Sequence, residues 1–166
     1  MKKIILGALT ATLLFAGCSS KETNENIVPK LVLGKSLEKV SLTDQFEKVH
    51  KIDATTKTVV FAFSKDGAHT CNDYFNTKPA TYLQDNNTQF IADVSAAPSL
   101  IRSLFIMPGL KDFKHTVLIL DDKQVASEFR ADMNTEKIVV ISLDNHKVSN
   151  IKNITTQDEL ILAIEK

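Results

Sequence analysis

Residues 58–94 read TVVFAFSKDGAHTCNDYFNTKPATYLQDNNTQFIADV, and this stretch decides the fold. Residues 58–63 are almost continuously apolar and rich in β-branched side chains, which is typical of a strand buried on both faces. Residues 88–94 predict a second strand. Between them, Thr70 and Asp73 have the spacing of a capping box, so we expect a loop over residues 64–69 and a helix that begins at Thr70. A strand, a helix and a strand in this order predict a sheet with parallel strands.

The chain on both sides of this unit continues the alternation. Thr156 and Glu159 form a second capping box before a final helix over residues 157–165. The other predicted segments are a front hairpin (37–42 with 49–52), a helical stretch (79–85), a strand (115–120), a helix or edge strand (125–129) and a late hairpin (138–143 with 148–154).

One further helix is predicted from four apolar side chains at helical spacing. Ser95 and Pro98 are typical of its beginning, and Pro108-Gly109 is typical of its end. Leu100, Ile101, Leu104 and Phe105 form its apolar face. We expect Phe105, Ile106 and Met107 to close the core against the sheet rather than to form a docking patch.

The order of elements is β-α-β-α-β followed by β-β-α, which predicts an α/β protein with a mixed sheet flanked by helices. Over residues 31–166 this arrangement resembles the thioredoxin-like fold, a three-layer sandwich. Residues 90–113 (FIADVSAAPSLIRSLFIMPGLKDF) are also similar to a segment of uncharacterised thioredoxin-like proteins of the bacterial envelope. The resemblance implies a fold but no particular activity.

The first residues, MKKIILGALTATLLFAGC, have a basic start and an apolar run, as a secretory signal does. Residues 14–18 (LFAGC) resemble the lipobox of bacterial lipoproteins, which implies cleavage before Cys18 and lipid on its thiol. The apolar run has 14 residues, whereas a spanning helix needs roughly 20. We therefore expect a signal peptide at 1–17, the lipidated cysteine and a flexible linker at 18–30, and the domain at 31–166. The lipoprotein resemblance also implies that Ser19, rather than an aspartate, directs the chain to the outer membrane of a double-membraned bacterium, with the domain facing the periplasm.

Charge and glycine content exclude several classes of function. Removal of Lys2 and Lys3 leaves 18 basic residues against 20 acidic ones, with no long basic run, so nucleic acid is not an expected partner. Beyond the signal the chain has three glycines, Gly34, Gly67 and Gly109. A glycine-rich phosphate loop cannot be built from them, and we expect neither a nucleotide nor another cofactor. The expected partners are the membrane, through the lipid, and an envelope protein.

Once Cys18 carries lipid, Cys71 is the remaining cysteine. Thioredoxin-like enzymes carry Cys-x-x-Cys where a helix follows the first central strand, and residues 68–71 here read AHTC. The resemblance places Cys71 at the second cysteine and Ala68 at the first, and it places His115 where redox relatives have a cis-proline. Two-cysteine disulfide exchange is then excluded. A position in the first turn of a helix would still favour a thiolate.

Three functions remain open at this point. The first is a non-catalytic binding or adaptor module, with Cys71 buried for packing. The second is a thiol-dependent oxidoreductase that uses Cys71 alone. The third is copper or zinc binding by His69, Cys71 and His115, because imidazole and thiolate suit these metals.

Overall fold

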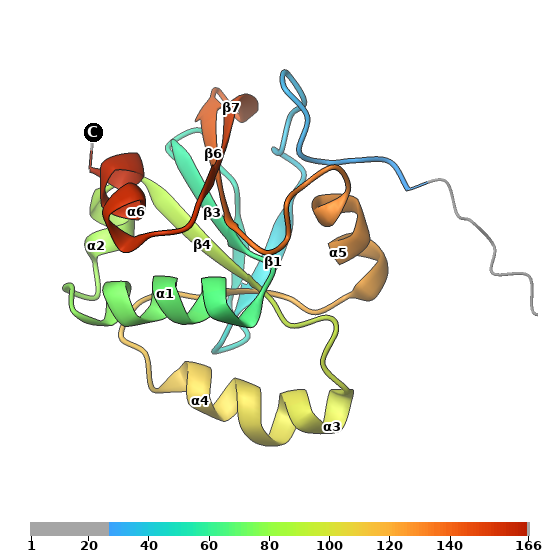
Figure 1. The fold of residues 1–166 in the computed structure, drawn as a ribbon, viewed down its shortest axis with the longest axis vertical. Coiled ribbons are helices and arrows are strands. Elements are labelled where there is room, and N and C mark those ends of the chain that lie inside the picture. The colour runs from blue at the N-terminus through green and yellow to red at the C-terminus, as the bar shows by residue number, and fades with distance from the viewer. Residues whose placement is uncertain (1–26, 166) are drawn as a thin grey trace, which may run out of the picture.

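The computed structural model describes residues 27–165, and it contains one seven-stranded sheet with helices on both faces (Figure 1). The predictions for residues 1–26, including the signal peptide and Cys18, lie outside this range. The elements are β1 (Ser41–Asp44), β2 (Val49–Lys51), β3 (Thr58–Ala62), α1 (Lys65–Asn76), α2 (Tyr82–Asp85), β4 (Thr88–Asp93), α3 (Ser99–Ile101), the π-helix η1 (Arg102–Ile106), α4 (Met107–Lys111), β5 (Leu118–Leu120), α5 (Lys123–Arg130), β6 (Ile138–Asp144), β7 (Lys147–Ile154) and α6 (Gln157–Ile164).

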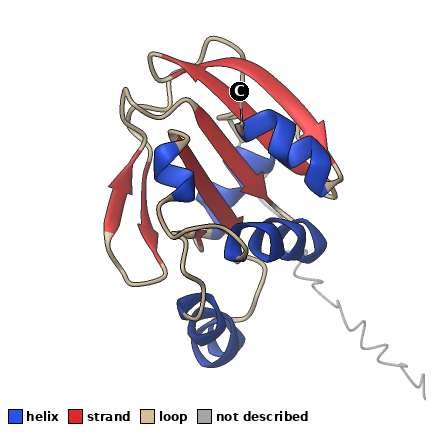
Figure 2. Cartoon of the chain, turned by 90° about the vertical axis from the view of Figure 1, so that its left-hand side faces the viewer, coloured by secondary structure: helices blue, strands red, loops and turns tan. Residues whose placement is uncertain are grey.

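The strands lie in the order β2-β1-β5-β4-β3-β6-β7. The three central strands, β5, β4 and β3, are parallel to one another. All the other neighbouring strands pair antiparallel: β2 with β1, β1 with β5, β3 with β6, and β6 with β7. This is the mixed sheet that the element order predicts. Figure 2 shows the twist of the sheet between its helical layers.

Two buried clusters hold the helices to the sheet. Side chains of α1, α2, α4 and α6 pack on one face, around Phe75 and Phe90. Side chains of α5 and of residues before β1 pack on the other, around Phe61 and Phe129. Every residue of β3 is buried, because both of its faces are covered. The three-layer α/β architecture is therefore confirmed.

The helix after β3 begins earlier than its capping box predicts. Ser64 is the N-cap, and its hydroxyl accepts a hydrogen bond from the Gly67 N–H at 3.2 Å. Thr70 lies inside α1 and donates its hydroxyl to the Asp66 carbonyl. The prediction of a loop over residues 64–69 is wrong, because a serine directly after the strand already satisfies the first free N–H groups of the helix.

The expected end of the next helix is also wrong. The helical segment runs through Pro108 and Gly109 to Lys111 as α4, after a π-helical turn from Arg102 to Ile106. Pro108 stands in the first turn of α4, where its missing N–H costs little. The π turn before it changes the register of the backbone hydrogen bonds. The helix therefore continues although Pro108 has no N–H to donate to the preceding turn.

Among the described residues, none of the helices is long and apolar enough to cross a membrane.

Candidate functional site

The start of α1 is the place where a thioredoxin-like enzyme carries its cysteines. Here residues 64–67 read SKDG, and the described chain has no thiol in that turn. A Cβ on Gly67 would lie 3.2 Å from Ser64 Oγ and 3.4 Å from Ile138 Cγ1, so the turn is packed closely against β6. The first turn of α1 therefore offers a hydroxyl, a lysine and a carboxylate, but no sulfur nucleophile.

Cys71 lies in the second turn of α1 and faces the core. Its side chain is fully buried, within the cluster that includes Phe75 and Ile138. Burial raises the pKa of the Cys71 thiol far above its usual range, because a thiolate loses its solvation there. The expectation that Cys71 occupies the first turn, where the helix dipole would favour a thiolate, is wrong.

His115 is a core histidine. His115 is 2% exposed, and its ring stacks on that of Phe113, with the two ring centroids 5.2 Å apart. Nε2 lies 2.9 Å from Asn72 Oδ1, and because that oxygen only accepts, Nε2 carries the proton. Nδ1 is then a buried acceptor without a hydrogen-bond partner. Burial lowers the pKa of His115 to about 4, so the ring is neutral near pH 7.

The expected metal ligands do not assemble into a site. His69 is exposed on α1, whereas Cys71 and His115 are buried. Within residues 27–165, no group of three histidine, cysteine, aspartate or glutamate side chains is placed to hold a metal ion.

The two arginines, Arg102 and Arg130, bind oxygen atoms near the carboxyl ends of β4 and β5. Arg130 Nε lies 3.5 Å from Asp93 Oδ2, and Arg102 donates to the Asp121 carbonyl at 3.1 Å. An arginine beside a cysteine would lower the pKa of its thiol and activate it. Cys71 lies in the core, and the arginines bind Asp93 and the Asp121 carbonyl instead.

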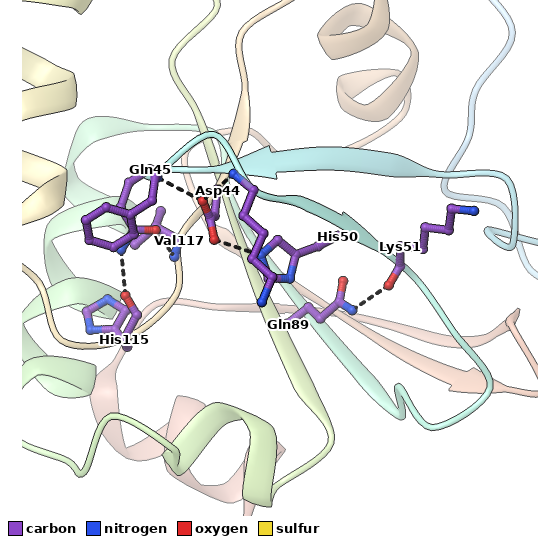
Figure 3. A network of polar contacts seen from close by, with 9 residues as sticks. Asp44, Gln45, His50, Lys51, Gln89, His115 and Val117 are labelled. Carbon is purple, nitrogen blue, oxygen red and sulfur yellow. Dashed lines mark hydrogen bonds and ion pairs between the residues drawn. The ribbon is translucent and has the colours of Figure 1, made fainter.

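A buried glutamine joins the front hairpin to the loop that contains His115. Gln45 is fully buried, and Figure 3 shows its side chain pointing toward His115 and Val117. Its Nε2 donates to the His115 carbonyl at 2.8 Å, and its Oε1 accepts from the Val117 N–H at 2.9 Å. The amide thus pairs with that loop as the backbone of a neighbouring strand would.

The residue before it, Asp44, fixes the hairpin turn. Its Oδ1 accepts from the N–H groups of Phe46 and Lys48, and its Oδ2 lies 2.7 Å from His50 Nε2 (Figure 3). Burial acts to raise the pKa of the Asp44 carboxyl, but the hydrogen bonds from His50 and the two backbone N–H groups together hold that pKa below its ordinary value.

These two residues support one wall of a cleft of about 720 Å³. His50 and Lys51 of β2 line this wall, Leu83 of α2 lines the opposite wall, and Phe90 and Leu118 contribute apolar surface. Gln89 ties the sheet to the hairpin, because its Nε2 donates to the Lys51 carbonyl at 2.9 Å (Figure 3). The Gln89 Oε1 atom is buried without a hydrogen-bond partner.

Sequence reasoning missed this cleft and its supports, Asp44, Gln45, His50 and Gln89. The predicted hairpin, with an aspartate near its turn, was a signal for Asp44. The role of Gln45 had no local signal, because its partner lies 70 residues away.

Comparison with solved structures shows that the domain has a thioredoxin-like fold. The exposed lipoprotein thioredoxin Etrx1 of Streptococcus pneumoniae matches with a TM-score of 0.53 and 14% identity, over 76% of this chain and 97% of that one. The thioredoxin domain of a thiol-disulfide oxidoreductase from Bacteroides vulgatus matches with a TM-score of 0.51 and 14% identity, over 81% and 96%. Peroxidoxin BcpB of Mycobacterium tuberculosis gives 0.51 and 13%, over 80% and 94%.

At these identities the likeness concerns the fold, which is thioredoxin-like. No protein-family model and no curated protein matches the sequence.

Proposed function

We propose that this chain is a lipid-anchored protein of a bacterial cell envelope, whose thioredoxin-like domain is a binding or adaptor module without thiol catalysis. The lipobox-like residues 14–18 support anchoring through Cys18. Ser19 favours the outer membrane, with the domain facing the periplasm.

One observation supports the absence of thiol catalysis: no accessible cysteine lies in α1. Disulfide exchange needs an exposed thiol with a low pKa. The turn from Ser64 to Gly67 supplies none, and Cys71 is buried with a raised pKa. The same burial argues against the monothiol alternative, and the exposed position of His69 argues against the copper or zinc alternative.

The cleft between β2 and α2 supports the binding part of the proposal. Its volume, about 720 Å³, lies in the range of ligand sites, and apolar side chains contribute to a lining that also carries lysines and carboxylates. Such a lining suits a peptide segment or a side chain of a partner protein better than a nucleotide, because it has no glycine-rich loop.

Lipidation is tested in cells that express the full chain and grow in medium with radiolabelled palmitate. We expect label on the wild-type chain and on Cys71→Ala, and none on Cys18→Ala, because the lipid is placed on Cys18. An unlabelled wild-type chain would refute the anchor.

Catalysis is tested separately by reduction of insulin with dithiothreitol, with a dithiol thioredoxin as the positive control. We expect the wild-type chain and Cys71→Ala to leave the uncatalysed rate unchanged. A wild-type rate above that of Cys71→Ala would restore the monothiol alternative.

A further inference from the structure

The helical segment Ser99–Lys111, made of α3, η1 and α4, turns large apolar side chains to solvent. Leu100, Ile101, Leu104 and Phe105 are 65%, 43%, 58% and 67% exposed. The prediction that Phe105 closes the core is therefore wrong, whereas Ile106 and Met107 pack against the core as predicted. The four exposed residues are named here the apolar face, and their spacing puts them on one side of the segment.

The opposite side of the same segment already holds it to the domain. Ile106, Met107 and Leu110 pack against the core cluster that includes Phe90. Figures 1 and 2 both place the segment at the edge of the molecule, below α1 in Figure 1. The apolar face is therefore not needed to attach the segment, and a cluster of large exposed apolar side chains marks a contact surface.

The length of chain between Cys18 and the described domain limits how far the domain can lie from the bilayer. Eight residues, 19–26, separate Cys18 from Ile27. At about 3.3–3.6 Å for each residue, Ile27 lies within roughly 30 Å of the lipidated cysteine. This step rests on the proposed lipid anchor. A domain held this closely meets the bilayer surface continually, so the local concentration of lipid is high.

The charges beside the apolar face favour an anionic lipid surface. Arg102, Lys111 and Lys114 lie in or directly after the segment, whereas the acidic residues beside it are Asp112 and Asp121, the second of which accepts from Arg102 through its carbonyl. Lys111 and Lys114 are exposed. Helices that lie in a membrane interface combine Leu and Phe on one side with Lys and Arg on the other. A second copy of the chain would instead bring like charges together, which opposes pairing.

We propose that Leu100, Ile101, Leu104 and Phe105 insert into the surface of the anionic bilayer to which Cys18 anchors the chain. The segment then lies in the plane of the interface, and the domain has a fixed orientation on the membrane instead of a free tether.

The natural chain has no tryptophan, so a single introduced indole reports its own environment. Phe105→Trp places it on the apolar face. Leu162→Trp is the matched control, because Leu162 is an equally exposed apolar residue, 71% exposed on α6, away from the segment (Figure 1). Each full, lipidated chain is reconstituted into vesicles of phosphatidylcholine and phosphatidylglycerol, with or without brominated acyl chains.

We expect the indole emission of the Phe105→Trp chain to shift to the blue. Brominated lipid should quench it at least twofold more than the emission of the Leu162→Trp chain. Leu104→Asp in the Phe105→Trp background should abolish the shift while circular dichroism reports an unchanged fold.

Two results would overturn the docking alone. The first is equal quenching of the indole in the two variants, in chains that float with the vesicles. The second is a blue shift of the Phe105→Trp chain that depends on protein concentration in detergent, which would favour a second copy as the occupant of the apolar face.

Failure of the anchor gives a different result. Chains that carry no lipid and do not float with the vesicles would overturn both the lipid anchor and the docking that depends on it.

Discussion

The side-chain amide of Gln45 hydrogen-bonds the backbone on both sides of Thr116, and its donor bond reaches the carbonyl of His115 at 2.8 Å. Gln45 is fully buried, so water does not compete for these groups. One side chain thus ties the front hairpin to the loop that contains His115. The link supports both the cleft wall and the aromatic surroundings of His115.

Gln45→Ala should therefore destabilise the domain strongly. It leaves the His115 carbonyl and the Val117 N–H buried without partners, at about 1–3 kcal/mol for each group. We expect a loss of about 3 kcal/mol in the free energy of unfolding, measured by urea denaturation. The exposed Gln124→Ala is the control and should change stability by less than about 0.5 kcal/mol. A loss below about 1 kcal/mol for Gln45→Ala would contradict the buried link.

His115 makes stability depend on pH. Burial lowers its folded pKa from 6.5 to about 4, so between these values the unfolded chain binds a proton that the folded chain does not. The contribution is complete above about pH 6.5 and is lost as the pH falls toward 4, by up to about 3 kcal/mol. Urea midpoints measured at intervals across this pH range, and at a neutral reference pH, follow the loss.

The slope assigned to His115 should disappear in His115→Leu and persist in His69→Gln, since His69 is exposed. The comparison uses slopes, so a general loss of stability in His115→Leu does not affect it. Equal slopes in both variants would place the titrating group elsewhere.

The central strands could be predicted from the sequence, because residues 58–63 and 138–143 carry buried β-branched runs that few other structures accommodate. The first strand of the front hairpin, predicted at 37–42, lies at Ser41–Asp44 instead. The start of α1 was predicted wrongly because Ser64 and Thr70 are both good caps. The better signal was the spacing of Ala68, Cys71 and Phe75, which share the buried side of α1.

Neither the exposure of the apolar face nor the contacts of Gln45 could be predicted in the same way. Periodicity in residues 100–105 reports that one helical side is apolar, but not whether that side meets the core or the solvent. The core is reached instead by Ile106, the last residue of the π turn, and by Met107 and Leu110 after it. The partners of Gln45 depend on how β1 lies beside β5, which local sequence does not encode.

The Asp44 carboxylate should hold the hairpin closed. Asp44→Ala removes the acceptor for the Phe46 and Lys48 N–H groups and for His50. We expect amide exchange at Phe46 and Lys48 to accelerate by roughly tenfold or more, while amides of β3 change in proportion to global stability alone. Asp44→Asn should have a smaller effect, because an amide oxygen still accepts. Unchanged exchange at both positions would show that the turn closes without Asp44.

The same carboxylate gives a second pH dependence. Its folded pKa lies below the usual value of about 3.9, so its stabilising effect is present above that value and disappears as the pH falls through the folded pKa. Exchange at Phe46 and Lys48, corrected for intrinsic rates, should therefore accelerate below about pH 3.9 in the wild type. In Asp44→Ala it should show no such step. A step of equal size in Asp44→Ala would assign it to another carboxylate.

The Cys71 thiol should report the opening of the core. Because the side chain is fully buried and its pKa is raised, a thiol reagent reacts only after the domain opens. With Cys18 replaced by alanine, Cys71 is the one thiol in the chain. We expect labelling to be slow in water and to accelerate with urea in parallel with unfolding. Gln45→Ala, destabilised by about 3 kcal/mol, should raise the rate about a hundredfold without touching the thiol. Fast labelling that Gln45→Ala leaves unchanged would mean that α1 exposes Cys71 by a local motion, and the monothiol chemistry would then regain its physical basis.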